Sequence, residues 1–186
     1  MFGFIRGVLS ALWQSWRHPI RSGLPVPPLD RIATQTWGDS DCGPCAATNV
    51  LAALGLPTNI AIARSKLLKT YKEGTSTEAL MDYLNASGAC ASLVYIQPGG
   101  MFEVVERATR GGSYCIPLVK GPRPDLGHFI LCNGTEFDGV RVVDSLPGPL
   151  SHVYFMPHKH FEGAVLRVDR KPFGGSAVVI LVRGRK

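Results

Sequence analysis

The chain has 186 residues, of which 45% are hydrophobic and 18% are charged, and a formal net charge of +6 at pH 7. This length fits one domain, or one domain with an arm, and the composition excludes a disordered chain. The five cysteines are an odd number, which excludes a fully paired disulfide framework within one chain and favours a reducing compartment. Much of the positive charge lies near the two ends, and we expect no nucleic-acid partner.

Residues 1–32 are predicted to form an amphipathic arm that continues into a proline-rich linker. Apolar residues recur at helical spacing between Phe4 and Trp16, and Pro25 and Pro27 follow. The apolar stretch is too short and too interrupted to span a bilayer, and no small-residue signal-peptide cleavage site follows it. We therefore expect the arm to dock on the domain or on a partner chain, with a membrane surface as the alternative. The expected location is cytoplasmic, or virion-associated for a phage-encoded protein.

The next part of the chain is predicted to be mostly helical. Apolar runs of helical period, with Gly and Pro at their ends, predict helices over 43–54, 59–72, 76–86 and 101–110, and a strand over 93–96.

From residue 114 onward the apolar pattern changes to alternating or continuous runs separated by turn residues. These runs predict strands over 114–119, 128–132, 140–143, 153–155, 164–168 and 177–182. Helices first and strands second predict an α+β fold, because a parallel sheet would need strands and helices in alternation.

Cys42 lies at the N-terminus of the first predicted helix. Backbone N–H groups and the positive end of the helix dipole favour an anion at that place, so the reactive thiolate is favoured over the thiol. Cys42 is therefore the candidate nucleophile. The other cysteines are expected to be buried and to act as small hydrophobic side chains: Cys45, Cys90, Cys115 and Cys132.

A nucleophilic cysteine needs a base, and the base needs a group that orients it. His128 begins one predicted strand and Asp144 ends the next, and a hairpin turning between 133 and 139 would bring the two side chains together. The carboxylate could then bond one ring nitrogen and leave the other facing Cys42. Each residue alone is typical of a strand end or a turn, but the three together predict a Cys-His-Asp triad.

This constellation resembles the papain-like cysteine peptidases and is most similar to the C39 family, which processes leader peptides, often as a domain of an exporter. The residues that carry the resemblance are Gln35, Asp41–Ala46, Gly127–Phe129 and Val143–Ser145. The similar part of the chain extends over roughly residues 33 to 168. Ser145 stands where the family usually has proline.

The resemblance implies a papain-like domain over 33–186, in which a helical part with the cysteine packs on an antiparallel sheet with the histidine and the aspartate. It also implies roles for individual residues: Cys42 is the nucleophile, His128 is the general base and acid, and Asp144 orients His128. Gln35 would donate a hydrogen bond to the oxyanion hole, beside the Cys42 backbone N–H. The implied activity is hydrolysis of peptide bonds with no cofactor and no metal.

Three alternatives remain open. The first is a cell-wall peptide hydrolase or amidase of the same fold, in a phage or bacterial accessory protein. The second is a thiol-disulfide oxidoreductase that uses Cys42-Gly43-Pro44-Cys45, although the polar stretch before Cys42 differs from the buried strand that such enzymes need. The third is a binding module that keeps the fold without turnover. Zinc is disfavoured because no second cysteine pair has finger spacing.

Overall fold

The computed structural model describes residues 23–28, 31–35, 40–68, 74–121, 127–146, 152–168 and 175–185. The helix predicted between Phe4 and Trp16 lies outside these residues. The described helices are α2 (Cys42–Ala53), α3 (Ile60–Leu67), α4 (Thr77–Ala86), α5 (Met101–Arg110) and α6 (His158–Ala164). None of them is both long and apolar enough to cross a lipid bilayer.

The strands form one sheet whose described neighbours are all antiparallel. They are β1 (Ala89–Ile96), β2 (Tyr114–Lys120), β3 (Gly127–Phe129), β4 (Leu131–Glu136), β5 (Gly139–Val143), β6 (Val153–Pro157), β7 (Arg167–Val168) and β8 (Ser176–Gly184). The spatial order is β1-β8-β2-β4-β5-β6, with β3 beside β2 and β7 beside β8. The last strand therefore lies between the first and the second, and the fold is α+β as predicted.

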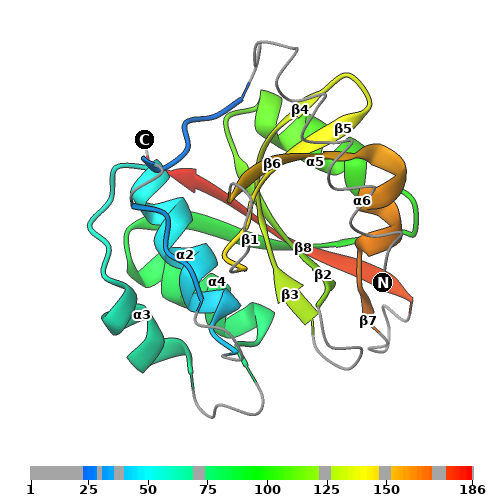
Figure 1. Cartoon of the computed structure of the whole chain (residues 1–186). Coiled ribbons are helices and arrows are strands. Elements are labelled where there is room, and N and C mark those ends of the chain that lie inside the picture. Colours follow the sequence, from blue (N-terminus) through cyan, green and yellow to red (C-terminus); the bar gives the residue numbers. More distant parts are fainter. Residues whose placement is uncertain are drawn as a thin grey trace.

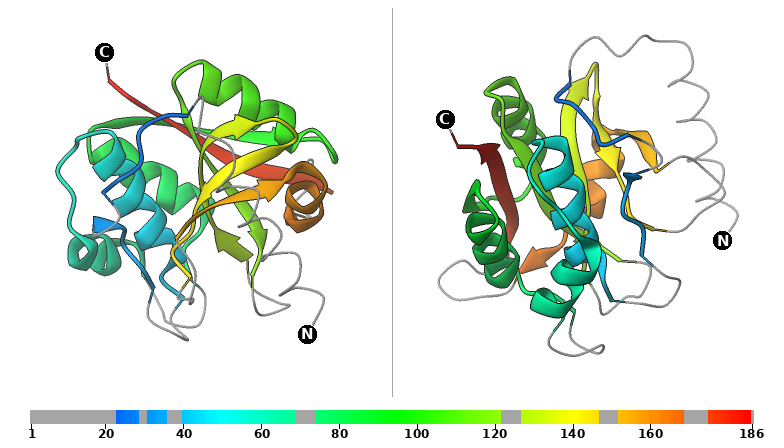
Figure 2. Two further views of the ribbon diagram at one scale, coloured as in Figure 1. Left: turned by 45° about the horizontal axis from the view of Figure 1, so that its top comes forward. Right: turned by 90° about the vertical axis from the view of Figure 1, so that its left-hand side faces the viewer.

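Two apolar clusters lie on opposite faces of the sheet. Helices α2, α3 and α4 cover one face, and α5 and α6 lie on the other side (Figure 1; Figure 2). Neighbouring residues of one strand point into different clusters: Leu131 packs toward α2, whereas Cys132 packs toward α5. This alternation follows from the two-residue period of a strand.

The cluster under α2 positions the candidate site. Cys42 and Ala46 of α2 belong to it together with Phe129, Leu131 and Val143 of the sheet. Phe129 follows His128 and Val143 precedes Asp144, so the packing of α2 on the sheet sets where the three candidate catalytic residues meet.

Several predicted boundaries are wrong for identifiable reasons. The strand predicted over 128–132 is interrupted at Ile130, which lies opposite Pro117. The Ile130 N–H donates to the Pro117 carbonyl at 3.4 Å. Proline has no N–H to return that bond, so the ladder breaks there. The predicted 133–139 turn is shorter, because β4 continues to Glu136. The strand predicted over 164–168 is shorter, since α6 extends through Ala164 and the strand β7 covers Arg167–Val168.

The end of the predicted linker packs on the domain. The Leu24 N–H donates to the Asn133 carbonyl at 2.7 Å, and the Asn133 side-chain amide donates to the Leu24 carbonyl at 2.6 Å. The Tyr114 hydroxyl donates to the Pro25 carbonyl at 2.8 Å, and Ile32 is buried in the cluster under α2.

Candidate active site

Cys42 is the first residue of α2 and is only 8% exposed. The next residue, Gly43, meets the segment that precedes α4. A Cβ atom at Gly43 would lie 2.5 Å from the side chain of Thr75. Because real Cβ atoms do not approach that closely, glycine is what lets Thr75 lie against the start of α2, beside the candidate nucleophile.

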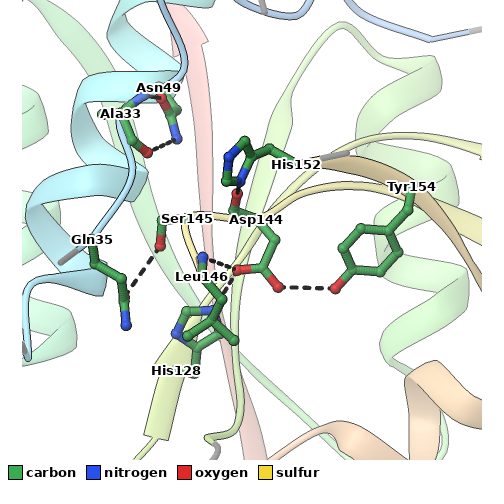
Figure 3. A network of polar contacts seen from close by, with 9 residues as sticks. All are labelled: Ala33, Gln35, Asn49, His128, Asp144, Ser145, Leu146, His152 and Tyr154. Carbon is green, nitrogen blue, oxygen red and sulfur yellow. Dashed lines mark hydrogen bonds and ion pairs between the residues drawn. The ribbon is translucent and has the colours of Figure 1, made fainter. Parts of the chain in front are cut away.

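His128 and Asp144 are in direct contact (Figure 3). His128 Nε2 lies 2.7 Å from Asp144 Oδ1, and the two residues are 3% and 7% exposed. His128 comes from β3, and Asp144 directly follows β5. The pairing of β4 with β5 places Leu131 opposite Val143, so the chain just before β4 and the chain just after β5 leave the sheet side by side.

Two further hydrogen bonds hold the Asp144 carboxylate. The Leu146 N–H donates to Oδ1 at 3.0 Å, and the Tyr154 hydroxyl donates to Oδ2 at 2.9 Å (Figure 3). Burial alone would raise the pKa of Asp144, but the bond and charge of His128 and these two donors outweigh it and lower the pKa below its ordinary value. Asp144 is therefore a fixed anion. Burial and the Asp144 charge raise the pKa of Tyr154, so its hydroxyl keeps its proton.

The His128 ring is held between Asp144 and Cys42. Burial disfavours the charged imidazolium, but the Asp144 carboxylate and the Cys42 sulfur together raise the pKa of His128 to about 9. Asp144 occupies Nε2, so Nδ1 is the ring nitrogen left for the Cys42 sulfur. At neutral pH the arrangement holds a protonated imidazole between a carboxylate and a cysteine.

Gln35 lies beside the residue that follows Asp144. Its backbone N–H donates to the Ser145 carbonyl at 2.9 Å, and the Ser145 hydroxyl donates to Gln35 Oε1 at 3.3 Å. With the amide oxygen bonded to Ser145, the amide nitrogen points away from it (Figure 3).

Helix α2 also holds the segment that carries Gln35. The Asn49 side chain accepts from the Ala33 N–H at 2.7 Å and donates to the Ala33 carbonyl at 3.1 Å (Figure 3). Asn49 and Cys42 lie on the same helix, and Ala33 lies two residues before Gln35. The candidate nucleophile and Gln35 are therefore positioned by one rigid element.

Four supporting residues were not predicted from the sequence: Tyr154, Leu146, Ser145 and Asn49. Tyr154 had the clearest signal, because it is a polar-tipped aromatic residue in a strand predicted directly after Asp144. The register Val142 to Tyr154, which brings its hydroxyl to the carboxylate, depends on strand pairing. The Leu146 contact is local, because its N–H bonds a carboxylate only two residues earlier, as in an Asx turn. The Ser145 and Asn49 contacts join distant parts of the chain, and no local pattern marks them.

All five cysteines are free, and the prediction that the four besides Cys42 are buried holds for three of them. Cys45, Cys115 and Cys132 are buried, and burial raises the pKa of each thiol. Cys90 is exposed, which corrects the prediction. The alternation of β1 turns Ala89 and Ala91 inward and Cys90 outward.

Asp41 lies directly before Cys42 and is 1% exposed. Its Oδ2 accepts from Arg64 Nε at 2.7 Å and also pairs with Arg64 Nη2, so α3 supplies the counter-charge. Among the described residues, no three His, Cys, Asp or Glu side chains gather as the ligands of a metal ion would.

Solved structures with a similar fold include peptidase domains. The chain is 16% identical to a double-glycine-motif protease from an AMS/PCAT transporter, solved in complex with the leader peptide, with a TM-score of 0.60 over 87% of this chain and 95% of that one. It is 18% identical to the peptidase domain of Streptococcus ComA, a bifunctional ABC transporter involved in a quorum-sensing pathway, with a TM-score of 0.60 over 87% and 99% of the two chains.

A third similar structure comes from Bacillus anthracis and is described as a C39-like peptidase. It is 13% identical, with a TM-score of 0.57 over 87% of this chain and 98% of that one. No protein-family model and no curated protein matches the sequence. The likeness therefore lies in the fold, which is that of the papain-like C39 peptidase domains.

Proposed function

We propose that this protein is a cysteine peptidase that cleaves peptide bonds with Cys42 as nucleophile, His128 as general base and acid, and Asp144 as the residue that orients His128. One observation carries the proposal. His128 contacts both Asp144, at 2.7 Å, and the sulfur of Cys42, which begins a helix. These two contacts raise the pKa of the buried His128 to about 9. A helix start and an adjacent imidazolium both favour the thiolate as the nucleophile.

In the proposed reaction the Cys42 sulfur attacks the carbonyl carbon of the scissile peptide bond. The negative charge that develops on the carbonyl oxygen needs fixed donors. The backbone N–H of Cys42, at the first position of α2, has no partner within the helix. The Gln35 amide nitrogen, turned away from Ser145, is the proposed second donor.

His128 then gives its proton to the leaving amine, and an acyl group remains on Cys42. The neutral imidazole removes a proton from a water molecule, which attacks the acyl group and releases the second product. Asp144 stays ionised throughout, because three hydrogen bonds hold its carboxylate. Tyr154 and Leu146 supply two of them and keep the carboxylate aimed at Nε2.

Two features argue against a thiol-disulfide oxidoreductase. The first strand of the described residues is β1, which follows α4, and the described residues 31–35 and 40–41 before Cys42 lie in no strand. Also, Cys42 faces a histidine–aspartate pair, which hydrolysis uses and dithiol exchange does not. The substrate is proposed to be a peptide, as one structure of similar fold holds a leader peptide. A peptide of the cell wall is the alternative within the same chemistry.

The test compares two matched cysteine variants under reducing conditions. Cys42→Ala is expected to abolish both peptide hydrolysis and labelling by an iodoacetamide probe, whereas Cys45→Ala is expected to keep most of both. Product analysis on glycine-rich peptides and on purified cell-wall peptide identifies the substrate class. Equal loss in the two variants, together with disulfide reductase activity in the parent, would overturn the peptidase proposal in favour of a dithiol enzyme.

A further inference from the structure

Cys45 has no part in the proposed hydrolysis, yet it lies one helical turn behind the nucleophile. We propose that Cys42 and Cys45 form a reversible disulfide that protects the nucleophile and stops hydrolysis when the protein meets a peroxide. The proposal rests on the proposed function only for the loss of hydrolysis. The disulfide itself is a property of the two thiols and Asp41.

The geometry of α2 allows this bond. Both cysteines are free, and they are the first and fourth residues of the helix. The rise and radius of an α-helix place Cα atoms three residues apart at about 5 Å, within the range of roughly 4.4–6.8 Å found in disulfides. Cys-x-x-Cys at a helix start is also a spacing at which dithiols are known to cycle between oxidised and reduced forms.

The buried carboxylate of Asp41 is the proposed acceptor of the Cys45 proton. Burial, and then the charge of Asp41, raise the pKa of Cys45, so this thiol stays protonated and does not compete with Cys42. Arg64 engages Asp41 Oδ2. Asp41 Oδ1 is buried and, apart from the side-chain contact of Asp41 with the Cys45 thiol, has no hydrogen-bond partner within the described part of the chain, which leaves a lone pair for that proton.

The chemistry needs one peroxide and no other reactant. The Cys42 thiolate attacks one peroxide oxygen, the O–O bond breaks, and Cys42 becomes a sulfenic acid while hydroxide leaves and takes a proton. Cys45 passes its proton to Asp41 and its sulfur attacks the Cys42 sulfur. The S–S bond forms, the S–O bond breaks, and the departing hydroxide recovers that proton as water. In sum, two thiols are oxidised and one peroxide is reduced to two water molecules.

The reverse reaction needs an external dithiol. Its thiolate attacks the Cys42 sulfur rather than the Cys45 sulfur, because Cys42 is 8% exposed and Cys45 is fully buried. The S–S bond to Cys45 breaks, and the Cys45 sulfur leaves and takes a proton. A second dithiol sulfur then releases Cys42 and leaves the reductant as a cyclic disulfide. The bond would keep Cys42 from the irreversible sulfinic and sulfonic acids.

The test follows the oxidation state of Cys42 in the full-length chain. The parent, Cys45→Ala and the control Cys90→Ala are treated with hydrogen peroxide, then with or without dithiothreitol. Free thiols are alkylated, and the peptide containing residues 42–45 is identified by mass spectrometry. Cys90 is the matched control because it is the exposed cysteine. In the parent and in Cys90→Ala, the expected product is a 42–45 disulfide, and dithiothreitol should restore labelling of Cys42 at least tenfold.

In Cys45→Ala the same peroxide treatment should leave Cys42 as sulfinic or sulfonic acid, and dithiothreitol should restore little labelling. Asp41→Asn should form the disulfide several-fold more slowly while its Cys42 still alkylates. Sulfinic acid at Cys42 in the parent, or equal recovery in parent and Cys45→Ala, would overturn the proposal. A disulfide that forms in a protein without any hydrolytic activity would instead contradict the proposed function and leave the switch standing.

Discussion

The substitution Asp144→Asn separates a catalytic role of Asp144 from a turn role, because it keeps the size of the side chain and removes its charge. The pKa of His128 is about 9 because the contacts with Asp144 and Cys42 outweigh burial. Without the carboxylate, burial opposes only the Cys42 contact, so the pKa of His128 is expected to fall, by roughly 1 to 3 units for the loss of one adjacent opposite charge.

The size of the effect follows from the protonated fraction of His128. At pH 8 an imidazole of pKa about 9 is roughly nine-tenths protonated, and a fall in pKa of about two units lowers that fraction to roughly one-tenth. We therefore expect kcat/KM at pH 8 to fall at least about tenfold from this cause alone. At pH 6 both forms are mostly protonated, so the loss there should be smaller and should report only poorer orientation of the ring.

The assay is kcat/KM for a fluorogenic peptide from pH 5 to 9.5. The alkaline limb of the profile is expected near pH 9 in the parent and to move to lower pH in Asp144→Asn. Tyr154→Phe is the matched control, because it removes one hydrogen bond from the carboxylate, at 2.9 Å, and keeps the charge, so the limb should stay near 9. An Asp144→Asn variant with the parent's kcat/KM and the same alkaline limb would refute the reasoning and leave at most a Cys42–His128 dyad.

Three other predictions follow from the same contacts. Gln35→Ala removes the proposed oxyanion donor and should lower kcat about 100- to 1,000-fold with little change in KM; an unchanged kcat in steady-state assays would exclude that role. His128 should stabilise the fold by about 3 kcal/mol, because its pKa rises from 6.5 to about 9 on folding. That stability is complete below pH 6.5 and is lost as the pH rises through 9, so thermal melts from pH 6 to 10 should show a falling Tm that the His128→Gln variant lacks. Deleting residues 1–22 keeps the bonds between Leu24 and Asn133 and should leave the melt and Cys42 labelling unchanged; a domain that unfolds would show that the arm belongs to the core.

The parts of the site that sequence reasoning could predict depend on local signals or on chain order. The apolar run after Cys42 and the stop at Gly55 place α2 within one residue of its observed ends. The meeting of His128 with Asp144 needs only that two consecutive strands form a hairpin, and β4 and β5 do pair in that way. The ends of a helix and the pairing of a single hairpin can be predicted by simple rules, because each depends on few contacts.

The parts that could not be predicted depend on pairing between distant segments. Pro117 interrupts the ladder at Ile130, but only the β2–β3 register puts these two residues opposite each other. Ser145 bonds Gln35 across a separation of 110 residues. It stands where the resembled family usually has proline, which carries no hydroxyl, so the contact that orients the Gln35 amide cannot be carried over from the resemblance.

The site is divided between two rigid parts, and this division has a consequence for activity. Helix α2 carries Cys42 and, through Asn49, holds the segment that ends in Gln35. The sheet carries His128 and Asp144. The distance between the Cys42 sulfur and the His128 imidazole is therefore set by the packing of α2 on the sheet, in the cluster that contains Cys42 itself.

Protein interiors pack as densely as organic crystals, so a cavity in this cluster displaces the side chains around it. Catalytic geometry tolerates displacements of much less than an ångström. A cavity in the cluster under α2 should thus lower activity at temperatures where the domain is still folded, whereas a cavity of equal volume under α5 should act on stability alone.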